Sequence, residues 1–266
     1  MVNEEPLVSI VMNCYNGEKY LKEAIDSIYD QSYKNWEIIF WDNLSTDNSA
    51  SIAKNYDQRL KYFLAEKTTS LGKARNLAMK QVNGRFVAFL DCDDLFLPDK
   101  IRLQLAKMQV NRAVLSYGSW IKINEEGEEV QKYIIEEKPN NKFDSLYSKY
   151  IVNFQTLMID NHYLKENNLS FDENLTFSMD HNLVLRVAYK TPVMSIDDIL
   201  AKYRVHSNAM SIDRKADKYD DLDYTMRFFE SIGVQGKFKN FRYIALKAKF
   251  RMLLADSFKD RNYKEM

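Results

Sequence analysis

The sequence predicts an α/β protein with a Rossmann-like, mostly parallel sheet flanked by helices and with a helical extension at its C-terminal end. Two observations predict this class. In the first half of the chain, short apolar runs alternate with segments in which apolar residues recur every three or four positions. Such runs are typical of strands buried on both faces, and the intervening period is that of amphipathic helices. Alternation of strands and helices favours a parallel sheet with helices on both faces.

The elements follow in order along the first 110 residues. Strands are predicted from runs of mainly apolar residues at 7–13, 36–41, 60–64 and 86–90. Helices are predicted from helical spacing of apolar residues or from a capping residue at the start, at 18–31, 46–56, 70–82 and 98–110. The pairs Asn16-Gly17 and Asn83-Gly84 supply the sharp turns between them.

The second half of the chain is less regular. A hairpin is predicted over 121–135, turning at Glu125-Glu126-Gly127-Glu128, and shorter mixed elements follow to about residue 212. From residue 216 onward the pattern is helical. We therefore expect one domain over 1–212, with halves at 1–110 and 111–212 that share a core, and then a C-terminal helical extension over 213–266.

The composition argues against several classes of protein. The 38 basic residues balance the 38 acidic ones, so no overall charge favours nucleic acid as a partner. The seven glycines form neither a dinucleotide-binding loop nor a phosphate-binding P-loop. Two cysteines are too few for a disulfide framework or a four-cysteine zinc site, and they suit a reducing compartment. The three histidines are widely spaced, so a bound metal would be held mainly by carboxylates.

The chain contains no apolar stretch close to the ~20 residues that cross a bilayer. Its first residues carry acidic side chains where a signal peptide carries basic ones. We therefore expect a cytoplasmic protein.

Polar side chains follow the predicted strands at their carboxyl ends. Asn13 follows the first strand, Asp42 the second, and Asp91 and Asp93 the fourth. Because the ligands of parallel sheets bind beyond these ends, we expect the four side chains to converge on one crevice. Two carboxylates at positions i and i+2 can hold Mg²⁺ or Mn²⁺ that bridges a diphosphate. The alternative is a solvated turn whose aspartates cap the next helix.

Two side chains near this crevice suit a nucleotide. Asp42 can accept hydrogen bonds from a nucleobase or a ribose hydroxyl, although it can equally turn the chain or cap the following helix. Arg75 lies in the first turns of the helix predicted at 70–82, where a guanidinium and free backbone amides can together hold phosphate or base. The alternative for Arg75 is an ordinary exposed arginine.

These motifs, in this order, resemble those of the family 2 glycosyltransferases of the GT-A fold. They read V-S-I-V-x-N-x-Y-N, W-D-N-x-S-T-D, G-K-A-R-N and F-L-D-C-D-D-x-x-x-P, and they cover about the first 110 residues. The resemblance implies a nucleotide-diphosphate-sugar donor, inversion at the anomeric carbon and a divalent cation, Mn²⁺ or Mg²⁺. It also implies that residues 1–110 bind the nucleotide and that residues 111–212 bind the acceptor.

The resemblance implies a donor site that comprises Asn13, Tyr15, Asp42, Arg75, Asp91 and Asp93. In that site Asp42 would contact the base or ribose, Arg75 the nucleotide, Asp91 the sugar or ribose and Asp93 the metal. Asn13 stands where the family often has threonine, and would face the uracil edge. Asn43 replaces a common second aspartate, a departure that concerns base selectivity.

The second half supplies a base and a further metal ligand. Asp180 opens a predicted helix and matches an aspartate of the family's Glu-Asp element, with Met179 in place of the glutamate. The resemblance makes Asp180 the catalytic base, whereas helix capping is the alternative, because a helix dipole favours a negative first turn. His206 lies in a Tyr-Arg-x-His element and would join Asp91 and Asp93 at the metal. Its alternative is a loop histidine bonded to backbone.

The implied function is transfer of a sugar from a UDP-sugar to a hydroxyl of a glycan or lipid-linked acceptor, in the synthesis of bacterial surface polysaccharide or glycoconjugates. One alternative is a non-catalytic module that binds nucleotide sugars, which Met179 keeps open. Another is a nucleotidyltransferase, which would need a glycine-rich basic loop where residues 13–18 lie.

The segment at 237–264 has nine basic residues, interleaved with aromatic and aliphatic ones. Such a segment can lie on an anionic bilayer, which would add peripheral contact with the inner face of the cell membrane. Its apolar stripe can equally pack on the same chain or on a second subunit of an oligomer.

Overall fold

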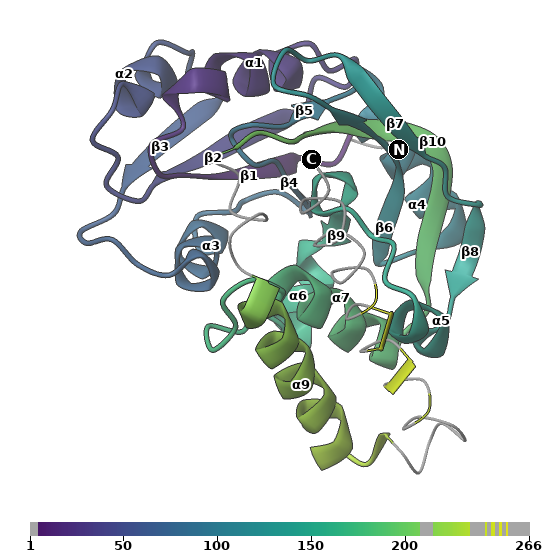
Figure 1. The fold of residues 1–266 in the computed structure, drawn as a ribbon. Helices are drawn as coiled ribbons and strands as arrows, with labels where there is room; N and C mark the ends of the chain where they lie inside the picture. The colour runs from purple at the N-terminus through teal and green to yellow at the C-terminus, as the bar shows by residue number, and fades with distance from the viewer. Residues whose placement is uncertain are drawn as a thin grey trace.

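The computed structural model describes residues 5–207 and 215–234, together with positions 243, 246–247, 250–251 and 254. The described strands form one ten-stranded sheet in the order β3-β2-β1-β4-β9-β6-β10-β5, with β7 beside β6 and β8 beside β10. Figure 1 shows α1 and α2 on one side of this sheet and α3, α6 and α7 on the other. The predicted α/β class with helices on both faces is confirmed.

The first four strands pair in parallel, as predicted. β1 (Val8–Cys14) lies between β2 (Trp36–Asp42) and β4 (Phe86–Phe89), and β3 (Leu60–Leu64) pairs with β2. The chain therefore reverses its direction of travel across the sheet between β1 and β4, the point at which parallel sheets place their ligands. The helices of this half are α1 (Glu18–Tyr29), α2 (Ser49–Lys54), α3 (Leu71–Met79) and α4 (Lys100–Asn111).

A buried polar cluster sets the register where these strands begin. Glu37 on β2 accepts hydrogen bonds from the Ser9 hydroxyl on β1 (2.5 Å) and from the backbone N–H of Asn83 (3.0 Å). The backbone N–H of Gly84 donates to the Ser9 hydroxyl (2.8 Å). A Cβ on Gly84 would lie 2.6 Å from the backbone nitrogen of Ser9, so this approach requires glycine. The cluster holds the starts of β1, β2 and β4 level, and their ends therefore fall side by side.

The second half of the sheet is mixed rather than parallel. β9 (Met158–Asp160) lies antiparallel between β4 and β6 (Leu115–Ile123), while β10 (Val193–Arg204) runs parallel to β6. The predicted hairpin is confirmed, but its first arm begins earlier, because residues from Leu115 onward form a buried central strand. The short strands that pair antiparallel at the margins are β5 (Leu95–Phe96), β7 (Glu129–Tyr133) and β8 (Lys138–Asn141).

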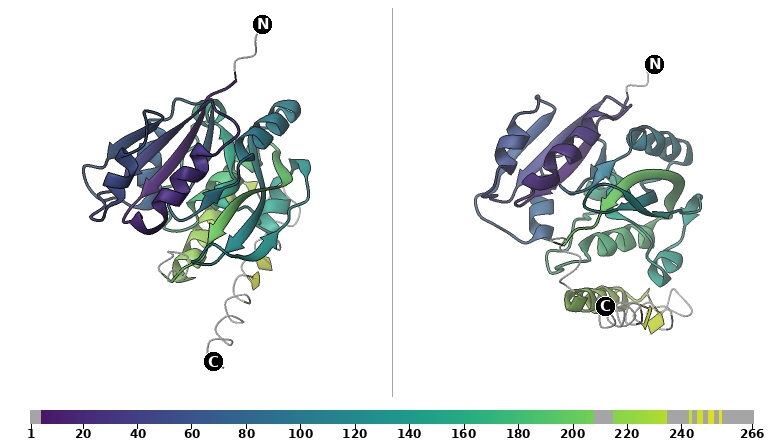
Figure 2. Two further views of the ribbon diagram at one scale, coloured as in Figure 1. Left: turned by 90° about the horizontal axis from the view of Figure 1, so that it is seen from above. Right: turned by 45° about the horizontal axis from the view of Figure 1, so that its top comes forward.

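Two apolar cores cover the faces of the sheet. Alternate residues of β1 face opposite ways, so Ile10 and Met12 pack with α1 and α4, whereas Val11 packs with α3 and α7 (Met179–Lys190). Figure 2 shows the purple and blue N-terminal half beside the teal and green second half. The shorter helical elements of the second half are α5 (Phe143–Ser148), the 3₁₀ helix (Phe154–Thr156) and α6 (Asn161–Glu166).

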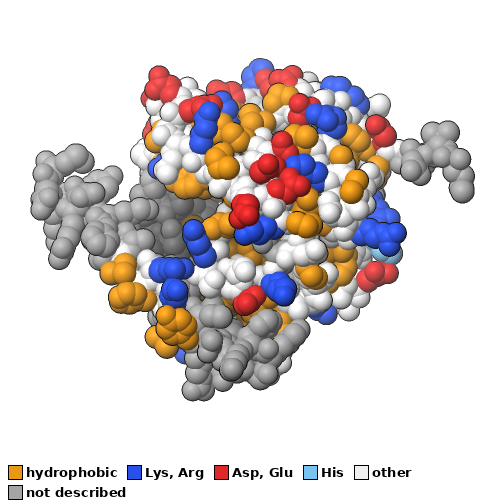
Figure 3. Space-filling view, turned by 90° about the vertical axis from the view of Figure 1, so that its right-hand side faces the viewer, with side chains coloured by type: hydrophobic (Ala, Val, Ile, Leu, Met, Phe, Trp, Pro, Cys, Tyr) orange, Lys and Arg blue, Asp and Glu red, His pale blue; other side chains and the backbone are white. Residues whose placement is uncertain are grey.

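Charges on the described surface are largely paired locally. Figure 3 shows acidic and basic side chains next to one another on one face, with apolar side chains scattered between them. Lys107, for example, forms ion pairs with Asp198 (2.8 Å) and Asp197 (3.1 Å). Such pairing agrees with the equal numbers of acidic and basic residues in the sequence.

The described part of the C-terminal extension includes α9 (Lys215–Ser231), which packs on the preceding residues. Phe229 is fully buried, and its ring centroid lies 4.8 Å from that of Phe143. None of the described helices is long and apolar enough to cross a membrane. The segment at 237–264, for which membrane contact is expected, lies outside the continuous ranges that the structure describes.

Asp221 anchors α9 to the start of α7. Asp221 is only 5% exposed. Its carboxylate accepts hydrogen bonds from three consecutive backbone N–H groups just before α7, those of Thr176 (3.1 Å), Phe177 (2.7 Å) and Ser178 (2.6 Å). We expect Asp221→Ala to lower the free energy of unfolding by about 2–4 kcal/mol, because three part-buried backbone donors lose a charged acceptor that is itself buried.

Urea denaturation measures this loss. Asp220→Ala is the matched control, since Asp220 is its exposed neighbour on the same helix, and it should change the free energy of unfolding by less than about 0.5 kcal/mol. Equal effects of the two substitutions would contradict the anchoring role of Asp221.

Candidate active site

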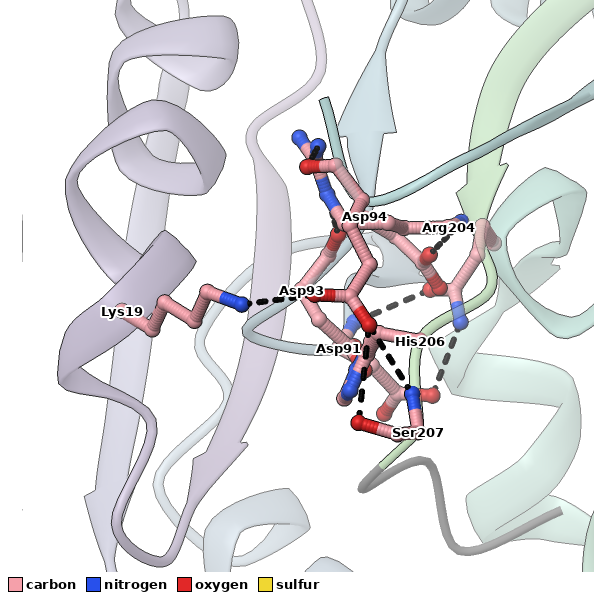
Figure 4. Close-up of polar contacts among 9 residues, drawn as sticks. Lys19, Asp91, Asp93, Asp94, Arg204, His206 and Ser207 are labelled. Carbon is pink, nitrogen blue, oxygen red and sulfur yellow. Dashed lines mark hydrogen bonds and ion pairs between the residues drawn. The ribbon is translucent and has the colours of Figure 1, made fainter. Parts of the chain in front are cut away.

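The carboxyl ends of the strands bring most of the predicted site residues to one edge of the sheet. Asn13 lies near the end of β1, Asp91 and Asp93 follow β4, and His206 comes two residues after β10. Figure 4 shows Asp91, Asp93 and His206 gathered in one place. Residues that are far apart in the sequence thus meet beside the point where β1 and β4 pair.

Asp93 and His206 form the centre of this cluster. The Asp93 Oδ2 and His206 Nε2 atoms are 2.9 Å apart, and the imidazole packs against the Tyr20 ring with centroids 5.2 Å apart. Burial, and after it the charge of Asp91, raise the pKa of Asp93, while the hydrogen bond with His206 acts in the opposite direction. A cation at Asp93 would relieve the same cost of burial and repulsion.

Asp91 is held from two sides by other side chains. Its Oδ1 accepts a hydrogen bond from the Arg75 guanidinium (3.2 Å), and its Oδ2 accepts one from the Gln155 amide (2.8 Å). The backbone N–H of Asp91 donates back to Gln155 Oε1 (2.9 Å), and Gln155 is only 1% exposed. Arg75 itself stacks on the Phe154 ring, 3.8 Å from its centroid. The Asp91 carboxylate is therefore fixed in place and less available to a metal than that of Asp93.

Arg204 fastens the aspartate turn to three other elements. Its backbone N–H donates to Asp94 Oδ1 (2.7 Å), and its guanidinium donates to the Asp93 carbonyl (3.0 Å), the Glu23 carboxylate (2.7 Å) and the Glu125 carbonyl (2.9 Å). The Arg204 side chain is 1% exposed. Arg204 lies two residues before the predicted histidine, but no role was predicted for it.

Asp180 lies in the first turn of α7, where Tyr150 contacts it. The Tyr150 hydroxyl donates to Asp180 Oδ2 at 3.3 Å, and the Tyr150 ring lies 4.0 Å from that of His181. Burial raises the pKa of Asp180, and the positive charge of Arg75 opposes this rise. Burial lowers the pKa of His181 to about 4, so its imidazole is neutral at pH 7. Since Arg75 acts on both Asp91 and Asp180, it links the strand-end cluster to α7.

The remaining predicted donor residues have different surroundings. Asp42 is fully buried and accepts hydrogen bonds from the Ser45 backbone N–H (2.7 Å) and the Tyr62 hydroxyl (2.6 Å), so one oxygen stabilises the turn after β2 and the other binds β3. Contact of Asp42 with a nucleotide stays a prediction. The Asn13 side-chain amide nitrogen is buried without a partner among the described residues, which makes it a donor available to a ligand. Tyr15 is 58% exposed on the loop after β1.

Neither Gln155 nor Tyr150 was predicted as a site residue. Tyr150 lies in irregular chain and Gln155 in the short 3₁₀ helix before β9, and neither carries a motif or a periodic pattern. Their roles follow from contacts with Asp91 and Asp180, which are distant in the sequence. No local signal in the sequence could have indicated them.

The donor atoms at the edge fit a cation that is shared with a ligand. No group of three or more His, Cys, Asp and Glu side chains is placed to hold a metal ion within the described ranges. Magnesium at phosphate sites usually binds one or two protein carboxylates and completes its shell with phosphate and water. The Asp93 carboxylate and the His206 imidazole suit such a partial set for Mg²⁺ or Mn²⁺.

The sequence of this chain is similar to known glycosyltransferases. It is 30% identical over 216 residues to the putative teichuronic acid biosynthesis glycosyltransferase TuaG of Bacillus subtilis, covering 79% of this chain and 84% of that protein. It is 29% identical over 211 residues to the glucosyltransferase WfgD of Escherichia coli, covering 78% and 81%. An uncharacterized glycosyltransferase of Rickettsia felis is 35% identical over 201 residues, 74% of this chain, and the chain spans only 33% of its length.

Solved structures share the fold. S. aureus TarS in complex with UDP-GlcNAc has a TM-score of 0.69 at 24% identity, over 82% of this chain and 65% of that one. The mannosyltransferase PcManGT from Pyrobaculum calidifontis, in complex with GDP-Man and Mn²⁺, has a TM-score of 0.66 at 14% identity, over 96% and 76%. These likenesses confirm the GT-A architecture. The model of glycosyl transferase family 2 matches residues 9–188, and the chain belongs to this family.

Proposed function

We propose that the protein is an inverting glycosyltransferase that moves a sugar from a UDP-sugar to a hydroxyl group of a glycan or lipid-linked acceptor. One observation carries the proposal. Arg75 holds Asp91 on one side and influences Asp180 on the other, beside the pair of Asp93 and His206. This arrangement provides groups for a diphosphate and a base within one site.

The donor side would use Asp93, His206 and Arg75. When bound, a divalent cation supplies positive charge that stabilises the departing diphosphate. Asp93 and His206 would hold that cation, and the Arg75 guanidinium would face the same diphosphate. The unpaired amide of Asn13 would donate to a uracil carbonyl. TarS, which was solved with UDP-GlcNAc, supports uracil as the base, whereas PcManGT was solved with GDP-Man.

The acceptor side would use Asp180 as the general base. A base with a raised pKa binds a proton more readily, and burial raises the pKa of Asp180. Asp180 would remove the proton from an acceptor hydroxyl that attacks the sugar on the face opposite the leaving diphosphate. Tyr150, which donates to Asp180 Oδ2, would hold the carboxylate in one orientation. Displacement from the opposite face inverts the anomeric carbon.

Met179 favours an enzyme over a non-catalytic module. This residue, which replaces a glutamate of the family pattern, is fully buried. A Cβ on Gly72 of α3 would lie 3.5 Å from the Met179 sulfur, so the methionine packs between α7 and α3. The substitution therefore falls in the core, and the base candidate at the next position keeps its place beside Tyr150.

The acceptor class rests on the names of relatives. TuaG is named for teichuronic acid biosynthesis, and WfgD for transfer to GlcNAc-diphosphoundecaprenol. We propose the same setting for this chain, namely synthesis of bacterial surface polysaccharide or glycoconjugates by a cytoplasmic enzyme. A lipid-linked acceptor would bring the enzyme to the inner face of the membrane, where the basic segment at 237–264 would contact anionic lipid.

An assay of donor hydrolysis without acceptor tests the enzymatic proposal directly. We expect slow release of UDP from a UDP-hexose in the presence of Mn²⁺, above the rate of the Asp180→Asn variant. Binding of UDP-hexoses without any release, with and without acceptor glycans, would favour a non-catalytic module.

The metal site makes a prediction about UDP affinity. UDP should bind more tightly with Mn²⁺ than with chelator, and Asp93→Ala should abolish this difference because it removes the carboxylate that faces the cation. His206→Gln should weaken metal-dependent binding by about 10–100-fold. Titration calorimetry measures both effects.

Asp30→Ala is the control for these variants, since Asp30 is exposed at the end of α1. It should leave the Mn²⁺-dependent affinity unchanged. Metal-dependent binding of full strength in Asp93→Ala would remove Asp93 from the metal site.

The base makes a prediction about pH. Asp180→Asn should lower turnover by a factor of ~10² or more while donor affinity stays close to that of the wild type.

Tyr150→Phe removes a hydrogen bond that lowers the pKa of Asp180, so the pKa of Asp180 should rise in this variant. Since protonated Asp180 cannot accept a proton, turnover falls below this pKa, and the acidic limb of the kcat profile should move to higher pH.

The pH dependence of kcat for each variant checks this shift. Tyr163→Phe is the control, because Tyr163 lies on α6 away from the cluster, and its acidic limb should match the wild type. An unshifted limb in Tyr150→Phe would separate Tyr150 from the base.

A further inference from the structure

The fold brings the two cysteines of the chain together. β1 and β4 pair in a register that runs from Val8 opposite Phe86 to Val11 opposite Phe89, and the backbone N–H of Leu90 still donates to the Val11 carbonyl (3.1 Å). Cys92 lies in the turn that follows, and Cys14 is the last residue of β1. The two segments stay side by side beyond β4, because the Cys92 thiol donates to the Asn13 carbonyl at 3.4 Å.

The two thiols also contact each other. A Cβ on Gly17 would lie 3.1 Å from the Cys14 sulfur and 3.6 Å from the Cys92 sulfur, so both sulfurs face the same small space, which a larger side chain would fill. Both cysteines are free. Cys14 is 2% exposed, whereas Cys92 is half-buried and thus the one that a reagent reaches first.

We propose that Cys14 and Cys92 form a reversible dithiol–disulfide pair, a modification site that reacts with peroxides. A disulfide needs Cβ atoms ~3.5–4.5 Å apart, so the two side chains must already face each other across a small space. Both sulfurs lie within 3.6 Å of the point where a Cβ on Gly17 would stand, so the bond can form by a small shift of the two side chains without a change of fold. Disulfides in reducing compartments are usually transient and redox-sensing, which suits a pair of this kind.

The reaction has two steps. One of the two sulfurs, as a thiolate, attacks one oxygen of the peroxide. The O–O bond breaks, and the other oxygen takes up a proton and leaves as water, so that the attacking cysteine becomes a sulfenic acid. The second sulfur then attacks the oxidised one. The S–S bond forms, the S–O bond breaks, and the oxygen leaves as water with the proton of the second thiol. Two thiols and one hydrogen peroxide thus yield one disulfide and two waters, and added dithiol reverses the bond by exchange.

The position of Cys92 couples this pair to the donor site. Cys92 stands between Asp91, which Arg75 and Gln155 hold, and Asp93, which contacts His206. An S–S bond of ~2.05 Å is shorter than a contact between two thiols, so its formation draws Cys92 toward β1. Both flanking carboxylates then shift, and UDP binding with Mn²⁺ weakens. This consequence rests on the proposed function, whereas formation of the bond does not.

Peptide mapping of the peroxide-treated full chain tests bond formation. After stoichiometric hydrogen peroxide and alkylation of the remaining thiols, we expect wild-type protein to lose both alkylation sites and to yield one cross-linked peptide pair that dithiothreitol releases. Cys14→Ser should give no cross-linked pair within a monomer, because it lacks one of the two sulfurs. The proposal would be overturned if the peroxide-treated wild type retained both thiols, or if its Cys92 were oxidised without a cross-linked pair. This outcome is read from the wild type alone, so it does not depend on whether a variant folds.

Calorimetry with UDP and Mn²⁺ tests the coupling. Oxidised wild type should bind UDP at least about tenfold more weakly than reduced wild type, the loss typical of a disturbed metal shell, and dithiothreitol should restore the affinity. Peroxide-treated Cys14→Ser cannot form the cross-link, so it should not show the reversible loss of UDP affinity that cross-linking causes in the wild type. An unchanged affinity in fully cross-linked protein would overturn the coupling. Failure of the reduced protein to bind UDP would instead contradict the proposed function, and the mapping result would still decide the disulfide.

Discussion

The edge of the sheet where the candidate residues meet depends on β1 being paired in parallel with both β2 and β4. The buried carboxylate of Glu37 receives donors from β1 and from the turn before β4, and Gly84 permits the close approach of backbone that this requires. Because strands rise by a constant step per residue, fixing their starts also fixes their ends. The ends of β1 and β4 consequently lie side by side, with Asn13 near the end of β1 and Asp91 just beyond β4.

Three aspartates within four residues acquire different properties from their neighbours. Asp91 is immobilised by Arg75 and Gln155, Asp93 meets His206, and Asp94 is buried beneath the backbone of Arg204. Carboxylates so close together repel one another, and each is stabilised by a group from another element. The division of roles therefore arises from α3, the 3₁₀ helix and the end of β10, which reach the same turn from different directions. Arg204 matters most here, since it joins the turn to α1 and to the hairpin.

Much of the fold was predictable, because the information was local. Apolar runs and helical spacing identified the strands and helices of the first half to within a few residues. The antiparallel insertion of β9 was not predictable, because Met158–Asp160 is too short to show a period and its partners are remote in sequence. The candidate site divides in the same way. Residues that end strands were found from their positions, whereas Tyr150 lies in irregular chain, Gln155 lies in a single 3₁₀ turn, and both act only through distant partners.

The sequence by itself determined the α/β class, the order of the elements in the first half and which polar side chains follow the strands. These properties depend on neighbours within a few residues, which a linear pattern records. Only the tertiary structure decided what each side chain does. It buried Asp42 with both oxygens engaged, paired His206 with Asp93, and set Cys14 against Cys92. Such contacts join segments far apart in the chain, and they exist only because strand register, twist and packing bring those segments together.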